Sequence, residues 1–191
     1  IVAVAAGRDH VVGLRLDGTV AIARGEKAVQ YNVSQWKNIV AVSADGEHLA
    51  GLKSDGTVVA VGQNSHGQCN VKGWKDIVQV SAGDYHTVGL KSDGTVVATG
   101  YTGNGQCDVE EWTDIVQISA GIYHTIGLKS DGTVVAVGMN DDKQCNVSDW
   151  TDIVYVSAGY FYTVGVKSDG TVVATGDNEF SQCEVNDWTD I

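Results

Sequence analysis

The chain has 191 residues, of which 43% are hydrophobic and 19% charged, a composition that excludes a disordered chain and suffices for a sizeable core. Twelve Lys and Arg against 24 Asp and Glu give a formal net charge of −12, which argues against a nucleic-acid partner and an anionic membrane surface. The 24 glycines and the absence of proline predict many tight turns, and no apolar stretch reaches the ~18 residues that cross a bilayer.

The sequence repeats every 38 residues. Tryptophan, cysteine and the tripeptide Asp-Gly-Thr each recur at this interval, which indicates a repeat architecture. The recurring residues are Trp36, Trp74, Trp112, Trp150 and Trp188, and Cys69, Cys107, Cys145 and Cys183. We therefore expect a single repeat domain over residues 1–191, with units at 1–38, 39–76, 77–114, 115–152 and 153–190.

The third unit shows which elements each repeat is expected to form. Its β-branched and alternating segments predict short strands, with no helical pattern of useful length. Asp93-Gly94 favours a two-residue hairpin turn with positive φ at both central residues, and residues 100–105 form a loop. The predicted strands cover residues 77–81, 86–91, 95–99 and, as a short fourth strand, 106–109.

The third strand of the unit indicates how the repeats pack. Val96-Val97-Ala98 does not alternate with polar residues, so the strand is expected to be buried on both faces. A blade stacked between two other blades meets this requirement. The sequence therefore predicts an all-β fold, a β-propeller of five blades, with a β-solenoid as the alternative. Two arrangements remain open: five blades that close by themselves, or five blades of a seven-bladed propeller.

The repeat resembles that of the regulator of chromosome condensation family. The residues that carry the resemblance are Ala-Gly-x-x-His, as at 82–86, a hairpin, a strand that ends at Gly100, and Gly105-Gln106. Unit 1 departs at Arg24-Gly25-Glu26-Lys27 and at Tyr31, and unit 5 has Tyr162 in the histidine position. The short period is similar to that of bacterial members, including propeller-type β-lactamase inhibitor proteins. The resemblance implies a propeller, usually of seven blades, and a structural histidine that bonds the backbone of its turn.

The residues that recur with the repeat have structural explanations. The four cysteines occupy equivalent places on different blades, too far apart for a disulfide or a shared zinc ion, so we expect free, buried thiols, which favour a reducing compartment or an anaerobic source. The Asp of each Asp-Gly-Thr is accounted for by its turn rather than by calcium. His66 is the only histidine outside the repeat and is expected to be exposed. No departures from the repeat cluster as a catalytic constellation, so we expect no enzyme activity, no metal and no cofactor.

The variable loops carry the candidate binding residues. An up-and-down chain path places the uniform Asp-Gly hairpins at the bottom of the propeller and two variable loops of each unit at the top. Six of the nine Tyr and Phe residues lie in these top loops. Exposed aromatic side chains are typical of protein interfaces, although some could instead plug the axial channel. The predicted partner-binding residues are Asp84, Tyr85, Tyr101, Ile122, Tyr123, Met139, Tyr160, Phe161 and Phe180.

The sequence therefore predicts a non-catalytic propeller that binds a protein partner with a basic surface through its top face. The family resemblance implies one alternative, nucleotide exchange on a small GTPase; the chromatin binding of the family's founder fits poorly with a charge of −12. A structural module of a larger surface or effector protein is a further alternative. Self-association is expected if the propeller is incomplete.

Overall fold

The structure, a computed structural model, describes residues 1–24 and 31–191. Within these residues the chain is all-β: fifteen strands form five three-stranded antiparallel sheets. The predicted all-β, five-bladed architecture is confirmed. The predicted departure of unit 1 at 24–27 lies, apart from Arg24, outside the described residues. In the described part of the chain no helix is long and apolar enough to span a membrane.

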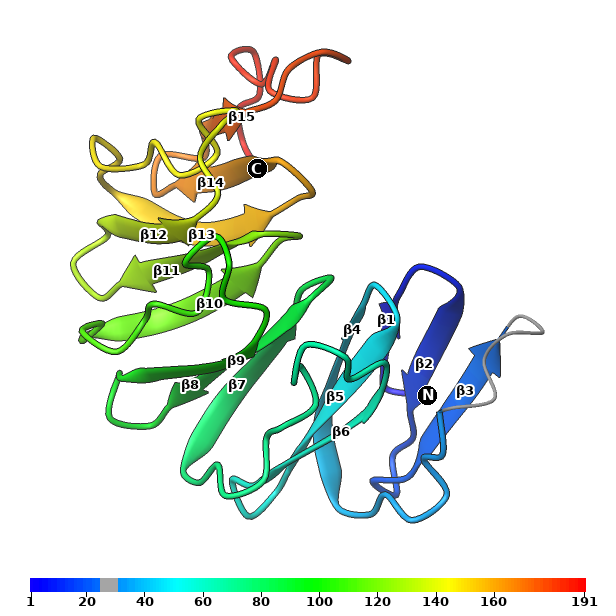
Figure 1. Ribbon diagram of the computed structural model, residues 1–191. Coiled ribbons are helices and arrows are strands. Elements are labelled where there is room, and N and C mark those ends of the chain that lie inside the picture. Colours follow the sequence, from blue (N-terminus) through cyan, green and yellow to red (C-terminus); the bar gives the residue numbers. More distant parts are fainter. Residues whose placement is uncertain (25–30) are drawn as a thin grey trace.

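Each blade is built from the three strands of its own repeat unit (Figure 1). Blade 1 has β1 (Ala3–Ala6), β2 (His10–Leu14) and β3 (Val20–Arg24); blade 2 has β4 (Ile39–Asp45), β5 (His48–Lys53) and β6 (Val58–Gly62); blade 3 has β7 (Ile77–Ala82), β8 (His86–Lys91) and β9 (Val96–Gly100); blade 4 has β10 (Ile115–Ala120), β11 (His124–Lys129) and β12 (Val134–Gly138); blade 5 has β13 (Ile153–Ala158), β14 (Tyr162–Lys167) and β15 (Val172–Gly176). No strand from one terminus completes the blade of the other within the described residues.

The predicted fourth strand is wrong. Residues 106–109 run through consecutive tight turns, in which Asp108 N donates to Gly105 O at 3.0 Å and Val109 N donates to Cys107 O at 2.9 Å. The backbone of this segment is therefore satisfied locally and has no need of a ladder with β9. Each repeat ends in a compact loop that leads to the tryptophan and then to the next blade.

The bottom hairpin also differs from the prediction. Lys91 N donates to Thr95 O at 2.9 Å and Gly94 N donates to Lys91 O at 3.0 Å, which makes a three-residue loop rather than a two-residue one. Only Gly94 takes a positive φ, at 81°. The Asp93 carboxylate accepts hydrogen bonds from the backbone N and the hydroxyl of Thr95, at 2.9 and 2.6 Å. The aspartate is a turn residue, as predicted.

Neighbouring blades interlock through tryptophan and glycine. A Cβ atom placed on Gly89 of β8 would lie 2.7 Å from Cζ3 of Trp74, and Gly51, Gly127 and Gly165 stand in the same relation to Trp36, Trp112 and Trp150. Each indole ring therefore occupies the space that a side chain on the next blade would fill. This packing explains why tryptophan recurs with the repeat.

A buried polar chain crosses the junctions between blades 2 and 3, 3 and 4, and 4 and 5. At the junction of blades 1 and 2, Leu49 takes the place of the threonine. His48 Nε2 donates to Thr87 Oγ1 of the next blade at 2.8 Å, and Thr87 Oγ1 donates to the backbone oxygen of Gln68 at 2.7 Å. His86 with Thr125, and His124 with Thr163, repeat this arrangement. The histidines are structural, as the family resemblance implied, but their partner is a side chain of the following blade rather than the backbone of their own turn.

The five blades form an open arc with blades 1 and 5 at its ends (Figure 1). Residues that are buried inside interior blades are exposed at these ends: Val4 is 69% exposed, whereas Val80 is 7% exposed. Trp188, the last of the recurring tryptophans, is 52% exposed. The alternative of five blades that close by themselves is therefore wrong for this chain.

Candidate functional site

Two layers of loops form the top face. The first layer joins the first and second strands of each blade, at residues 7–9, 45–47, 83–85, 121–123 and 159–161; the second layer follows the third strand, at residues 63–68, 101–106, 139–144 and 177–182. Backbone hydrogen bonds join the layers within a blade: Tyr101 N donates to Tyr85 O at 2.9 Å, and Met139 N donates to Tyr123 O at 2.8 Å. The variable side chains are thus held on a fixed backbone.

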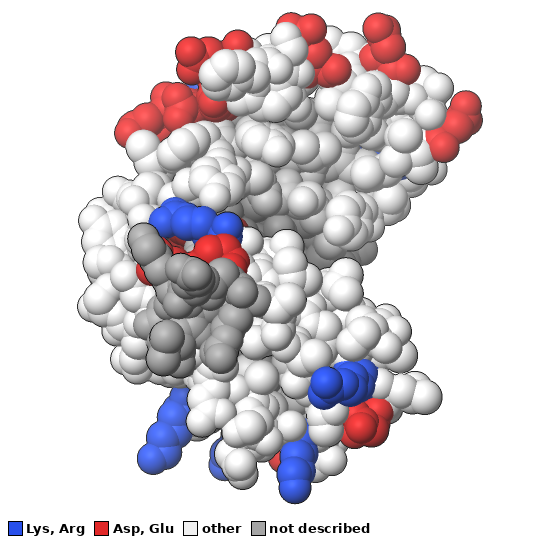
Figure 2. Space-filling view, turned by 90° about the vertical axis from the view of Figure 1, so that its right-hand side faces the viewer, with Lys and Arg blue, Asp and Glu red and all other residues white. Residues whose placement is uncertain are grey.

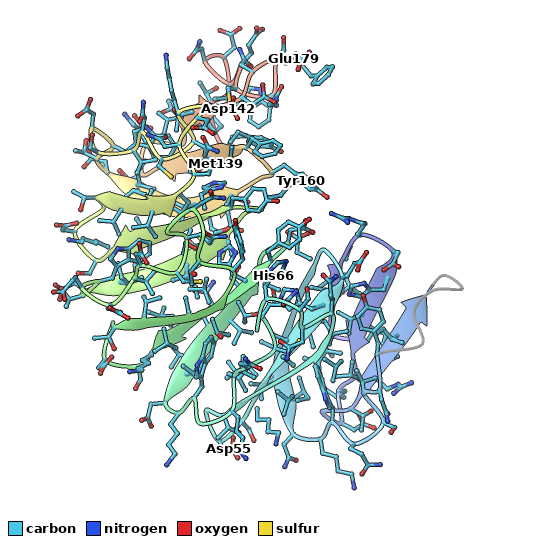
Figure 3. All side chains as sticks on the ribbon, in the orientation of Figure 1. Asp55, His66, Met139, Asp142, Tyr160 and Glu179 are labelled. Atoms are coloured by element: carbon cyan, nitrogen blue, oxygen red, sulfur yellow. The ribbon has the colours of Figure 1, made fainter. Side chains whose placement is uncertain are left out.

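Four aromatic rings from three blades meet on the top face. His66 of blade 2, Tyr85 and Tyr101 of blade 3, and Tyr123 of blade 4 line a cavity of about 260 Å³, which we name the tyrosine pocket. The Tyr85 and Tyr123 rings stack with centroids 5.1 Å apart and an interplanar angle of 10°. Figure 3 places His66 on the inner side of the arc, away from Asp55 at the bottom hairpin.

The remaining ring pairs of the pocket meet edge to face. His66 lies 5.6 Å from Tyr85 and 5.2 Å from Tyr101, and Tyr101 lies 6.1 Å from Tyr123, each distance joining ring centroids. These distances fall within the range of favourable aromatic pairs. Burial raises the pKa of Tyr123, and a hydrogen bond with Tyr85 raises it further. The rings therefore form one cluster rather than four independent side chains.

An ion pair joins blade 1 to blade 3 across the top face. Arg8 Nη2 lies 2.9 Å from Oδ2 and 3.2 Å from Oδ1 of Asp84, and the Asp84 side chain is 2% exposed. The Asp84 carboxylate raises the pKa of Arg8, as do, to a lesser extent, hydrogen bonds to Tyr85 and Tyr160. A guanidinium group therefore lies against the tyrosines of this face, with a buried carboxylate as its counter-ion.

The predicted binding residues fall into three sets. Tyr85, Tyr101 and Tyr123 belong to the tyrosine pocket. Phe161 lies next to Tyr160, with ring centroids 6.5 Å apart, and Figure 3 shows Tyr160 projecting into the open side of the arc. Asp84 and Ile122 are buried, at 2% and 7% exposure, while Met139 is half-buried and Phe180 is 81% exposed. The aromatic candidates are thus divided between the tyrosine pocket, the Tyr160–Phe161 pair and the exposed Phe180, and the side chains of Asp84 and Ile122 lie beneath the surface.

Sequence reasoning missed two residues of this site. His66 is exposed, as expected, but its ring is a wall of the tyrosine pocket. It interrupts the repeat in a top loop, as the tyrosines do, so the same criterion would have selected it. Arg8 departs from the repeat at the same top-loop position as Asp84, but its pairing with Asp84, 76 positions later, depends on the curvature of the arc and could not be predicted.

The top face is acidic. Its described loops carry eight acidic residues and two basic ones, and one of the basic residues, Arg8, is already paired with Asp84. Burial raises the pKa of Asp45, and the nearby Asp84 charge adds to this effect. Figure 2 shows acidic side chains gathered over the C-terminal end of the molecule, with lysine and arginine side chains near its middle and at the opposite end. The acidic residues are Asp9, Asp45, Glu47, Asp84, Asp141, Asp142, Asp177 and Glu179.

The four cysteines are free, as predicted, but they are half-buried rather than buried. Each thiol lies in the loop after the third strand and donates to a backbone oxygen of that loop; Cys107 Sγ, for example, lies 3.4 Å from Tyr101 O. Burial raises the pKa of Cys69, Cys107 and Cys145 to about 11. No group of three or more potential metal ligands occurs in the described ranges 1–24 and 31–191.

The chain belongs to the regulator of chromosome condensation (RCC1) repeat family. The family model matches four times, at residues 39–68, 77–106, 115–144 and 153–182, which are units 2 to 5. The resemblance seen in the sequence is therefore confirmed. A comparison with curated proteins found no match.

Solved structures share the fold. Prp20p of Saccharomyces cerevisiae, studied for its binding to Gsp1p and histones, matches with a TM-score of 0.76 and 18% identity over 92% of this chain and 58% of its own. Yeast RCC1 (Prp20) bound to Kap60 matches with a TM-score of 0.79 and 18% identity, over 100% of this chain and 60% of its own. The ectodomain of the Physcomitrella patens receptor kinase CR4 matches with a TM-score of 0.75 and 22% identity, over 93% and 52%. The chain thus spans about three fifths of the yeast structures.

Proposed function

We propose that this chain is a non-catalytic module that binds a protein partner through its top face. The observation that carries the proposal is the tyrosine pocket, which gathers variable aromatic residues from three blades on a rigid scaffold. Tyr160, at 49% exposure, and Phe180, at 81%, add apolar surface elsewhere on the top-face loops. Clustered aromatic side chains are typical anchors of protein interfaces, and protein binding by Prp20p shows that this fold can serve such a role.

The proposal is tested by capture of partners from a lysate of the source cells. The bait is the wild-type chain, and the comparison is the double variant Tyr123→Ala, Phe161→Ala. We expect the double variant to lose the specifically captured protein, since an anchor residue contributes ~2 kcal/mol or more to binding. Lys91→Ala with Lys129→Ala, beside the bottom hairpins, is the matched control and should capture normally. Capture that depends on the lysines and not on the aromatic residues would contradict the proposal.

Both aromatic residues of that test are half-buried, so their removal has a structural cost. The alternative that the rings plug the channel predicts that the double variant unfolds. Thermal unfolding of the variant separates the two readings. A folded double variant that no longer captures its partner supports the proposal, and an unfolded one supports the plug.

Nucleotide exchange on a small GTPase is a second candidate function. It is favoured by the family and by the likeness to Prp20p, which was studied with Gsp1p. An assay of nucleotide release from candidate GTPases tests it. Faster release in the presence of the chain, reduced by the top-face variants, would place GTPase regulation ahead of simple binding.

We also propose that the 191-residue chain associates with further copies of itself through the end faces of the arc. Trp188 lies at the position where the other tryptophans pack against a glycine of the next blade. Gly13 of blade 1 is the equivalent glycine without a preceding tryptophan; its nearest side-chain neighbour is Ile1. The forward face of blade 5 and the backward face of blade 1 are therefore complementary in the same register as the interior junctions.

A further inference from the structure

The size of the tyrosine pocket limits what can enter it. Its volume of about 260 Å³ lies below the roughly 300–1,000 Å³ of pockets that hold drug-sized molecules. A cavity of this volume matches a single amino-acid side chain of a partner. All four lining residues are aromatic and none is a carboxylate or an ammonium group, so the entering group meets rings together with their hydroxyl and imidazole groups.

Aromatic rings of this kind discriminate by charge. The face of a tyrosine ring is negative, and it attracts a lysine or arginine cation within ~6 Å of the ring centroid. The loops that line the pocket carry one acidic residue, Asp84, which is paired with Arg8, whereas the flanking loops of the top face carry seven acidic residues against two basic ones and add to this preference at longer range. An acidic side chain would therefore be repelled, and a neutral one would gain nothing from the surrounding charge.

The structure already holds a cation on this face. The Arg8 guanidinium lies 2.9 Å from Asp84, next in sequence to Tyr85, and interacts with the hydroxyl groups of Tyr85 and Tyr160. Asp84 is buried, so its charge acts on the Arg8 guanidinium with little screening by water. The environment beside the tyrosine pocket is thus one in which a basic group is stable.

We propose that the tyrosine pocket receives a lysine or arginine side chain of a protein partner, held by cation–π contacts with Tyr85, Tyr101 and Tyr123. This inference rests on the proposed top-face function and specifies the chemistry of the partner at its anchor point. The acidic loops attract the basic segment of the partner, and the rings select the side chain that enters.

The inference is tested with acetylated, amidated pentapeptides that differ only at the central residue of Gly-Gly-X-Gly-Gly. X is lysine, arginine, norleucine or glutamate, and binding is followed by NMR of the protein with labelled tyrosine rings. We expect saturable shifts of the Tyr85, Tyr101 and Tyr123 resonances with the lysine and arginine peptides. Norleucine retains the apolar chain of lysine without its charge, and it should bind at least ~fivefold more weakly. Equal binding of norleucine, or binding of glutamate, would overturn the inference.

Substitutions separate the ring face from the hydroxyl group. Tyr123→Phe keeps the ring and should keep the affinity for the lysine peptide within ~twofold, whereas Tyr123→Leu should weaken it at least ~fivefold. Tyr101→Leu is a second variant in case Tyr123→Leu does not fold. Tyr155→Leu, at an exposed tyrosine outside the pocket, is the matched control and should bind as the wild type does. Normal binding by the leucine variants, or loss of binding in Tyr123→Phe, would refute a cation–π site.

The same variants distinguish this inference from the function on which it rests. If Tyr123→Leu loses both the lysine peptide and the captured partner, both proposals are supported. If it loses the captured partner while the wild-type pocket ignores the lysine peptide, the binding face stands and the cation site is overturned. If it loses the peptide but still captures its partner, the cation site stands and the proposed use of the top face in that complex is contradicted.

Discussion

The junctions between blades 2 and 3, 3 and 4, and 4 and 5 each contain a histidine that is buried and neutral. The hydroxyl proton of Thr87 is directed to Gln68 O, so the hydroxyl oxygen accepts from Nε2 of His48, which fixes Nε2 as the protonated ring nitrogen. Burial lowers the pKa of His48 and His124 to about 4 and that of His86 to about 3. Protonation of any of the three would place a charge in a blade junction.

Mild acid is therefore expected to destabilise the fold. In the unfolded chain these histidines have a pKa near ~6.5, so between pH ~6.5 and ~4 the unfolded state binds protons that the folded state does not. Stability is complete above this window and falls through it by up to about 1.4 kcal/mol per pH unit for each histidine. Urea unfolding at pH 7.0 and 5.0 measures the loss. His86→Gln should reduce the pH dependence by about a third.

Thiol reactivity provides a second test at the residue scale. Cys69, Cys107 and Cys145, with pKa values of about 11, carry almost no thiolate at neutral pH and should react slowly with a disulfide reagent in the native state. Cys183 lies in blade 5, which no further blade covers, and should react first. Denaturation without reductant should release four thiols. A count of two or none would contradict the free state of the cysteines.

At the scale of the element, the sequence predicted the strands better than the connections between them. The first three strands of each unit follow from β-branched residues and apolar faces, and they lie close to where they were expected. The segment 106–109 contains the β-branched Val109, but its backbone N–H groups donate to carbonyl groups a few residues earlier in the chain. Composition alone does not show whether such a segment forms tight turns or a strand. The hairpin around Gly94 was located correctly but its loop length was not, because Asp-Gly suits both turn types.

The interlocking of tryptophan and glycine leads to a prediction for the interior junctions. In Gly89→Ala the new Cβ would lie 2.7 Å from Trp74 Cζ3, so the indole ring or the strand must shift. We expect a loss of about 1–3 kcal/mol in the free energy of unfolding, as for other overpacked cores. Gly13→Ala is the matched control at the open end, where the new atom meets only the flexible Ile1 side chain, and it should cost less. Equal losses, measured by denaturant unfolding, would show that the indole contact is not decisive.

At the scale of the whole molecule, contacts between distant blades depend on the curvature of the arc and cannot be predicted from a single repeat unit. The repeat predicts the blades and the direction of their loops, because both follow from 38 residues. The rotation between successive blades determines which distant residues meet. It brings Arg8 to Asp84, and it brings His66 to the three tyrosines of the pocket. The same rotation determines that five blades leave an arc, with one face of blade 1 and one of blade 5 uncovered (Figure 1).

These two end faces should cause the chain to associate head to tail. Val4 and Tyr155 are 69% and 54% exposed. The other recurring tryptophans pack against a glycine of the following blade, and Trp188 has no such glycine in this chain. We expect sedimentation at rising concentration to show species heavier than the 20.1 kDa monomer. Val4→Glu should block the face of blade 1, and Trp188→Glu the face of blade 5. Val78→Glu, at an equally apolar position that is 54% exposed within an interior blade, is the matched control.

Mixing the two blocked variants gives the decisive measurement. Val4→Glu retains only the forward face of blade 5, and Trp188→Glu retains only the backward face of blade 1, so neither should associate alone. Together each offers the face that the other lacks, and a one-to-one mixture should form a dimer of about twice the monomer mass and nothing larger, because a heterologous contact with one blocked end cannot extend. If the mixture remains monomeric while the wild type associates, the copies join through another surface. If the wild type itself remains monomeric at all concentrations, the end faces do not bind a second copy.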